Sequence, residues 1–200
     1  GSFPVSASNG FNLYSPTFHR RMTKAEIKAF AKDFGRAVEC AYNAGFDSVE
    51  VHAGHGYLIS QFLSPYTNHR RDEYGGSLEN RMRFMNLVLE EVMEAARRRR
   101  MAVLVKHNME DGFRRGVQVE ESIEIAKQIE SFGVDGIVLS SGFVSKAPMA
   151  VMRGRIPTKT MAYYMGWNEW LQKIVVSLFG EWLIKQYDFT GQRRVSFEYI

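Results

Sequence analysis

The chain has 200 residues, which is enough for one domain with a real hydrophobic core, and 45% hydrophobic and 24% charged residues are ordinary for a globular protein. A net charge of +4 is mild, and the single cysteine, Cys40, excludes an internal disulfide framework and favours a cytoplasmic location. We find no signal peptide and no apolar run long enough to span a bilayer, so we expect no membrane partner.

The first 22 residues show no hydrophobic period and contain Pro4, Gly10 and Pro16, so we expect a loop there. A capping box at 23–26 then predicts the start of a helix, whose apolar residues recur at helical spacing as far as residue 41. Gly45 is a natural helix stop, because glycine adopts the left-handed backbone conformation at that position.

Short apolar strands and helices alternate after this point. The predicted strands are 48–52, 102–106 and 136–139, and the predicted helices are 77–97 and 120–132. Four arginines at 97–100 end the first of these helices, where cations suit the helix dipole. Aromatic residues are not interleaved with them, so we expect no nucleic-acid partner.

The alternation predicts an α/β fold of parallel strands joined by helical crossovers. A glycine followed two residues later by an aspartate precedes two of the strands, at 45–47 and 133–135. This repeat indicates a βα unit, as in a TIM barrel or a doubly wound sheet. Three clear strands cannot close a barrel of eight, so a partial barrel is the prediction.

The pattern changes beyond residue 142. We therefore predict a barrel segment at 1–142 and a helical or irregular extension of the same domain at 143–200. An apolar stripe predicts an amphipathic helix at 167–185, which could lie on a membrane surface. We favour packing against a barrel wall or another subunit.

The stretch from 49 to 83 carries most of the chemistry. His52 and His55 follow a strand, at the end where α/β folds place active sites, and could together hold and polarise a carbonyl or nitro oxygen. Tyr57 could donate a proton. Two loop histidines bonded to the backbone and an ordinary half-buried tyrosine are the plain alternatives. A zinc site that adds Asp72 is a weaker one.

The same stretch closely resembles the signature of the old yellow enzyme family. Members of this family are FMN-dependent ene-reductases and NADH:flavin oxidoreductases with a TIM barrel. The matching residues are His52–Leu58, Gln61–Pro65, Asn68, Arg70, Asp72, Tyr74–Ser77, Asn80, Arg81, Arg83 and Phe84. A weaker likeness runs from 22 to 142, which corresponds to strands four to six of the family's barrel.

This resemblance implies catalytic roles for three residues. His52 and His55 would bind the electron-withdrawing oxygen of a small-molecule substrate, and Tyr57 would protonate the α-carbon after hydride arrives from reduced FMN. Lys106 falls where the family usually has an arginine beside the flavin, so it is the expected cofactor-binding residue. No metal is expected.

The resemblance implies an enzyme that reduces activated C=C bonds, such as α,β-unsaturated carbonyls, with NADH or NADPH. We expect this chain to be a fragment of that enzyme. The alternative is a catalytically inactive barrel remnant that acts only through association. Exposed sheet edges or the 167–185 helix could then form a homo-oligomer.

Overall fold

The computed structural model describes residues 4–12, 17–146, 168–171, 173–174 and 177. The chain divides into two compact units, 1–147 and 148–200. In the second unit, residues 169–171, 173–174 and 177 are helical, within the helix predicted at 167–185, and the remainder of that prediction lies outside the described residues. The predicted division at residue 142 and the proposed oligomer contacts of this helix stay predictions.

The first unit contains two sheets and four helices within its described residues. In chain order the elements are β1 (Val5–Ser6), β2 (Gly10–Asn12), β3 (Thr17–Arg21), α1 (Lys24–Asn43), β4 (Ser48–Ala53), α2 (Leu58–Leu63), α3 (Leu78–Arg99), β5 (Ala102–Asn108), α4 (Val119–Ser131) and β6 (Gly136–Ser140).

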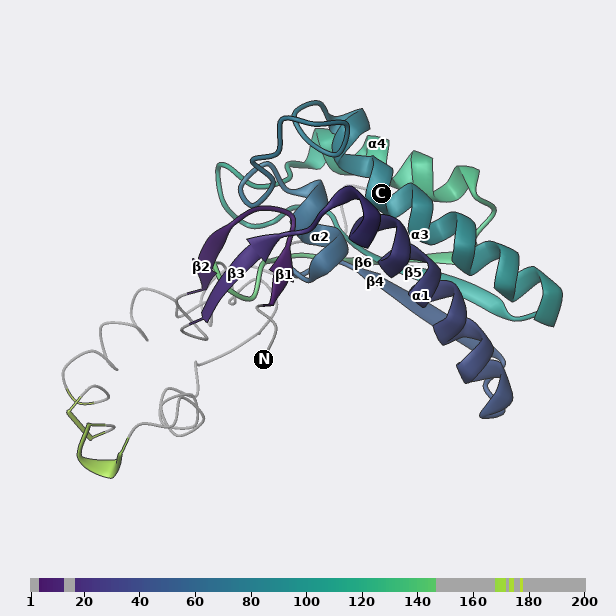
Figure 1. Cartoon of the computed structure of the whole chain (residues 1–200), viewed down its shortest axis with the longest axis horizontal. Coiled ribbons are helices and arrows are strands. Elements are labelled where there is room, and N and C mark those ends of the chain that lie inside the picture. Colours follow the sequence, from purple (N-terminus) through teal and green to yellow (C-terminus); the bar gives the residue numbers. More distant parts are fainter. Residues whose placement is uncertain (1–3, 13–16, 147–167, 172, 175–176, 178–200) are drawn as a thin grey trace, which may run out of the picture. The chain divides into compact units, whose positions relative to one another are not determined.

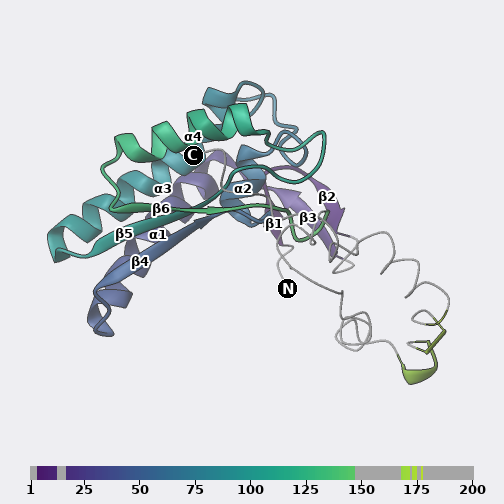
Figure 2. The ribbon, with the colours of Figure 1, turned by 180° about the vertical axis from the view of Figure 1, so that it is seen from behind.

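The central sheet is parallel, with strand order β4-β5-β6, and this confirms the predicted α/β class (Figure 1). Its alternate side chains point to opposite faces. One face is buried in the hydrophobic core with residues of α1, α3 and α4, and it includes Val51, Val103 and Val105. On the other face His52 pairs in register with Lys106, and both are only partly buried. Figure 2 shows the three strands side by side from behind.

The helix boundaries follow the local sequence signals. Thr23 and Glu26 form the predicted capping box at the start of α1, and the Ser77 hydroxyl accepts the Asn80 backbone N–H at the start of α3. Arg100 ends α3 in a left-handed conformation. None of the described helices is long and apolar enough to cross a membrane.

Two parts of the sequence prediction were wrong. The region 1–22, predicted as a loop, contains β1, β2 and β3, in which β3 pairs with both others. Strands of two and three residues are too short to establish a hydrophobic period. Helix α2 was also missed. It has only six residues, of which four are buried, so it has no clear polar face.

Arg70 ties the N-terminal strands to the loop that precedes α3. Its side chain is 1% exposed, and Nη1 donates to the carbonyl oxygens of Ala7 at 3.0 Å and Met22 at 2.8 Å. Nε and Nη2 donate to the two carboxylate oxygens of Asp72, at 3.0 and 2.8 Å. Arg70 and Asp72 therefore form a largely buried ion pair.

Replacement of Arg70 by alanine should therefore destabilise the fold strongly. The change leaves two carbonyls and the Asp72 carboxylate without their partner, at an expected cost of ~3 kcal/mol in the free energy of unfolding. Urea denaturation measures this change in the free energy of unfolding. Arg71→Ala is the matched control, because Arg71 is exposed. Equal denaturation midpoints for the two variants would contradict this role of Arg70.

His107 lies in the core on the helix-facing side of β5 and is 1% exposed. Its Nε2 lies 2.9 Å from the Ser122 hydroxyl oxygen, and that hydroxyl donates to the carbonyl oxygen of Asn108 at 3.0 Å. Because the hydroxyl proton is already used, Nε2 carries the ring hydrogen, and Nδ1 is buried without a partner. Burial lowers the pKa of His107 to about 4.

His107 should make the fold sensitive to mild acid. Its pKa is depressed in the folded state, so between pH 6.5 and 4 the unfolded chain binds the extra proton and stability falls as pH falls. From pH 7 to pH 5 the wild-type protein should lose about 2 kcal/mol more unfolding free energy than His107→Asn. Urea titrations at both pH values measure the difference. An exposed-histidine control, His69→Asn, should behave as wild type, and the same acid loss in all three proteins would refute this role.

Candidate active site

His52, His55 and Tyr57 meet just beyond the carboxyl end of β4. The centroid of the His52 ring lies 4.9 Å from that of His55, nearly edge-on, and 4.9 Å from that of Tyr57. Tyr57 is the N-cap residue of α2 and is 53% exposed. The Nδ1 atom of His52 is buried and has no hydrogen-bond partner among the residues that the structure describes. Three polar rings therefore share one end of the sheet, as the sequence predicted for that end of the strand.

An unusual backbone turn sets the position of His55. Its φ is 59°, in the left-handed region that glycine favours. Its N–H donates to the Asn108 side-chain oxygen at 3.2 Å, and its carbonyl oxygen accepts the Val144 N–H at 3.0 Å. A β-bridge to Phe143 joins the same turn to the loop after β6. The contacts from two neighbouring loops hold this conformation.

Two glycines beside His55 make room for other protein atoms. A Cβ at Gly54 would lie 2.6 Å from the Asn108 side-chain oxygen, and one at Gly56 would lie 2.4 Å from the Phe143 ring. These glycines therefore have a packing role. They allow the β4 loop to lie against β5 and against the loop after β6.

Ser140, the last residue of β6, orients the His55 ring. Its hydroxyl oxygen lies 2.6 Å from His55 Nε2. This contact joins two strand ends that are far apart in the sequence. Sequence reasoning missed both Ser140 and Asn108, although each lies at the carboxyl end of a parallel strand, where functional side chains are expected.

Lys106 and Glu50 are charged residues on the face of the sheet opposite the hydrophobic core. The Lys106 ammonium lies 2.6 Å from a carboxylate oxygen of Glu50. Burial lowers the pKa of His52 and of His55, and the positive charge of Lys106 lowers both further. Each imidazole is therefore neutral near pH 7, with one N–H donor and one acceptor.

A cavity of about 640 Å³ adjoins this cluster. His55 and Tyr57 are among its lining residues, whereas His52 and Lys106 are not. Residues of the β1–β3 sheet and of the loops after β5 and β6 complete the wall. A volume of this size suits a small organic molecule.

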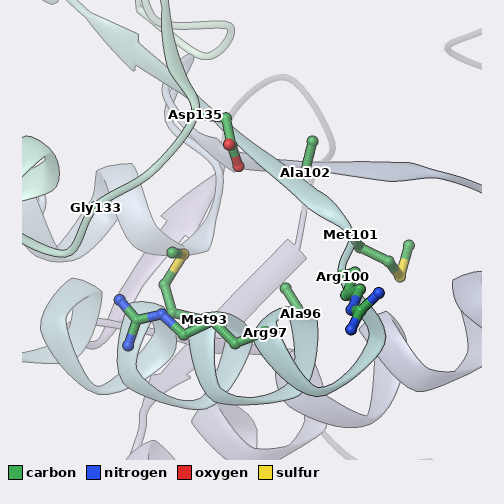
Figure 3. A pocket seen from close by; sticks show the side chains of 8 residues that line it. All are labelled: Met93, Ala96, Arg97, Arg100, Met101, Ala102, Gly133 and Asp135. Atoms are coloured by element: carbon green, nitrogen blue, oxygen red, sulfur yellow. The ribbon is translucent and has the colours of Figure 1, made fainter.

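A second hollow, of about 370 Å³, lies at the opposite end of the sheet, by the amino ends of β5 and β6 (Figure 3). Its polar groups already serve the fold. Asp135 accepts the backbone N–H of Val103 at 2.7 Å, and Arg97 donates to the carbonyl oxygen of Phe132 at 2.8 Å. This hollow contains no histidine or tyrosine, so the chemistry is concentrated at the carboxyl end.

The zinc alternative receives no support from the geometry. In the part of the chain that the structure describes, no three His, Cys, Asp or Glu side chains gather so as to hold a metal ion. Asp72, the third ligand of that hypothesis, gives both carboxylate oxygens to Arg70.

Comparison with known proteins identifies the family. The model of the NADH:flavin oxidoreductase / NADH oxidase family matches residues 3–174. The 4,4'-dithiodibutanoate disulfide reductase of Rhodococcus erythropolis is 40% identical over 136 residues, which are 68% of this chain and 34% of that protein. The NADPH dehydrogenase of Geobacillus thermodenitrificans is 40% identical over 144 residues, 72% of this chain and 41% of that protein.

A solved structure gives the same result. The old yellow enzyme homologue from Zymomonas mobilis superposes with a TM-score of 0.61 at 29% identity, and the match covers 76% of this chain and 48% of that one. The predicted resemblance to the old yellow enzyme family is therefore confirmed. The chain spans well under half the length of the two curated relatives named above.

Proposed function

Because the chain belongs to the NADH:flavin oxidoreductase / NADH oxidase family, we propose that it forms the substrate-binding part of an enzyme that reduces activated C=C bonds. The family uses FMN, with NADH or NADPH as the reductant. The observation that carries the proposal is the cluster of His52, His55 and Tyr57 at the carboxyl end of a parallel strand. Its substrate would be a small α,β-unsaturated carbonyl compound or a similar molecule.

We further propose that β4, β5 and β6 are strands four to six of an eight-stranded barrel. Three features support this assignment. The strands are parallel, the described helices α1, α3 and α4 pack on one face, and the other face carries the half-buried charged pair Lys106 and Glu50. In such a barrel the helices form a ring around the outer face of the sheet, and the active site lies at the carboxyl ends of the strands.

The residues present fit one side of a bound flavin. The buried, unpartnered Nδ1 of His52 is available to a ligand atom, and Lys106 offers a cation on the same face of the sheet. Lys106 would stabilise the negative charge of the reduced ring, although it lacks the planar fork of the arginine more usual in the family. FMN, when bound, supplies the hydride that reaches the β-carbon of the substrate.

The two histidines would hold the substrate oxygen. Each neutral imidazole has one N–H to donate, and together they would polarise the carbonyl so that the β-carbon accepts hydride more readily. Ser140 limits the rotation of the His55 ring. The N–H donor of that ring is therefore oriented before the substrate arrives. Tyr57 would then give its phenolic proton to the α-carbon. As Tyr57 is 53% exposed, water can restore that proton.

Flavin titration of the full-length protein tests the cofactor assignment. We expect one FMN per chain, and Lys106→Met should weaken binding of the reduced form more than of the oxidised form, because only the reduced form carries negative charge on its ring. Fluorescence quenching and the reduction potential measure this. Lys127→Met, which removes an exposed lysine of α4, is the control. A full-length protein that binds no FMN would instead support the barrel-remnant alternative.

Tyr57→Phe tests the proton donor. Loss of the phenolic proton should slow reoxidation of the reduced enzyme by an enone about 10²-fold or more. Flavin reduction by NAD(P)H needs no proton from Tyr57 and should change only a few-fold. Stopped-flow measurement of each half-reaction separates the two effects. Equal slowing of both half-reactions would rule out the proton-donor role.

A further inference from the structure

We propose that the cavity beside Tyr57 selects substrates that carry an aromatic ring and a carboxylate remote from the reducible C=C bond, and that Arg115 binds this carboxylate. The inference rests on the proposed function, because it concerns the other end of the same substrate. The observations that carry it are the charge of the cavity wall, its aromatic surface, and the rigidity of the loop that bears Arg115.

The cavity wall is positively charged. Its described lining residues include no aspartate or glutamate and one arginine, Arg115, which is exposed. A second cation, Lys146, lies with its ammonium 5.6 Å from the ring centroid of Tyr66, itself a lining residue. An anion inside this cavity meets attraction and no opposing carboxylate from the wall.

One side of the cavity is aromatic. Tyr66 and Phe143 line it, and Phe113 contacts both rings, with centroids 4.9 Å from Tyr66 and 5.6 Å from Phe143. All three pairs meet nearly edge to face. Such a wall packs well against another aromatic ring, which gains both buried area and favourable ring geometry.

The loop that carries Arg115 is anchored at both ends. The Asp111 N–H donates to the Val117 carbonyl oxygen at 3.0 Å, and the Val117 N–H donates to the Asp111 carboxylate at 2.8 Å. The Asn108 amide also donates to that carboxylate, at 3.0 Å. Gln118 donates to the carbonyl oxygens of Phe113 and Gly116 inside the loop.

The two neighbouring arginines of this loop differ in one respect. Both Arg114 and Arg115 are exposed, but only Arg115 lines the cavity. The closed base of the loop fixes this difference, because a wide rotation of the segment would break the Asp111–Val117 bonds. Arg115 is thus held at the cavity while the ring of the substrate contacts Tyr66 and Phe143.

The test compares two enones that differ only in charge. The probes are 4-(3-oxobut-1-enyl)benzoate and the corresponding benzamide, reduced by the full-length flavoprotein. The measured quantity is the ratio of kcat/KM for the benzoate over the benzamide. Arg115→Gln should lower this ratio about tenfold, because a hydrogen bond to a charged group is lost. Arg114→Gln should leave it within twofold, and Arg115→Lys should restore most of it.

Ionic strength gives an independent readout. The benzoate preference of the wild-type protein should shrink between 10 mM and 500 mM salt, while Arg115→Gln should show little salt dependence. If Arg114→Gln and Arg115→Gln lower the ratio of kcat/KM equally, the inference is wrong, because the preference then reflects the general positive charge of the loop. A ratio unchanged in Arg115→Gln would also overturn it.

Two further outcomes separate the sources of failure. If Arg115→Gln slows flavin reduction by NADPH about tenfold more than by NADH, the anion at Arg115 is the extra phosphate of the reductant, and the substrate assignment is wrong. If the protein binds FMN but reduces neither enone, the proposed function itself, the reduction of activated C=C bonds, is contradicted. If the protein reduces the benzamide but shows no preference for the benzoate, the carboxylate site at Arg115 is wrong and the proposed function stands.

Discussion

The geometry of the candidate site depends on one buried amide. Asn108 is 2% exposed at the end of β5, and its side chain joins the loops that follow all three parallel strands. Its oxygen accepts the His55 N–H, and its nitrogen donates to Asp111 at 3.0 Å and to the Gly142 carbonyl oxygen at 2.7 Å. An aspartate at this position could accept but not donate, so only an amide satisfies both sides. The turn at His55 and the loop of Arg115 therefore share one anchor.

The cost of the His55 backbone explains why such an anchor is needed. A non-glycine residue in the left-handed region costs about 1–2 kcal/mol. Each hydrogen bond to the turn contributes about 1 kcal/mol, so the bonds from Asn108 and Val144 together offset that cost. The turn places the His55 ring against Ser140 and edge-on to His52. The left-handed backbone of His55, the close packing of the neighbouring glycines and the orientation of the His55 ring thus depend on one another.

The sequence predicted most of this fold because its signals are local. Capping by Thr23 and Ser77, and apolar strands followed by helices, are read within a few residues of each element. The proximity of the two histidines to Tyr57 could also be predicted, since all three lie at or just after the end of one predicted strand. Ser140 and Asn108 were missed as site residues because their role depends on register between strands, which local patterns do not encode. The short strands β1 and β2 are likewise stabilised by partners in the fold rather than by their own sequence.

The charge on the inner face of the sheet links this arrangement to the cofactor. The Lys106 and Glu50 side chains are 30% and 35% exposed, so their ion pair is partly screened by solvent and contributes at most about 1 kcal/mol. Lys106 can therefore turn from Glu50 to another anion at little cost. Burial lowers the pKa of both histidines, and the same ammonium lowers it further. In the proposed function, one lysine would serve two needs of flavin chemistry: it would offer positive charge to a reduced ring, and it would help to keep the neighbouring imidazoles uncharged.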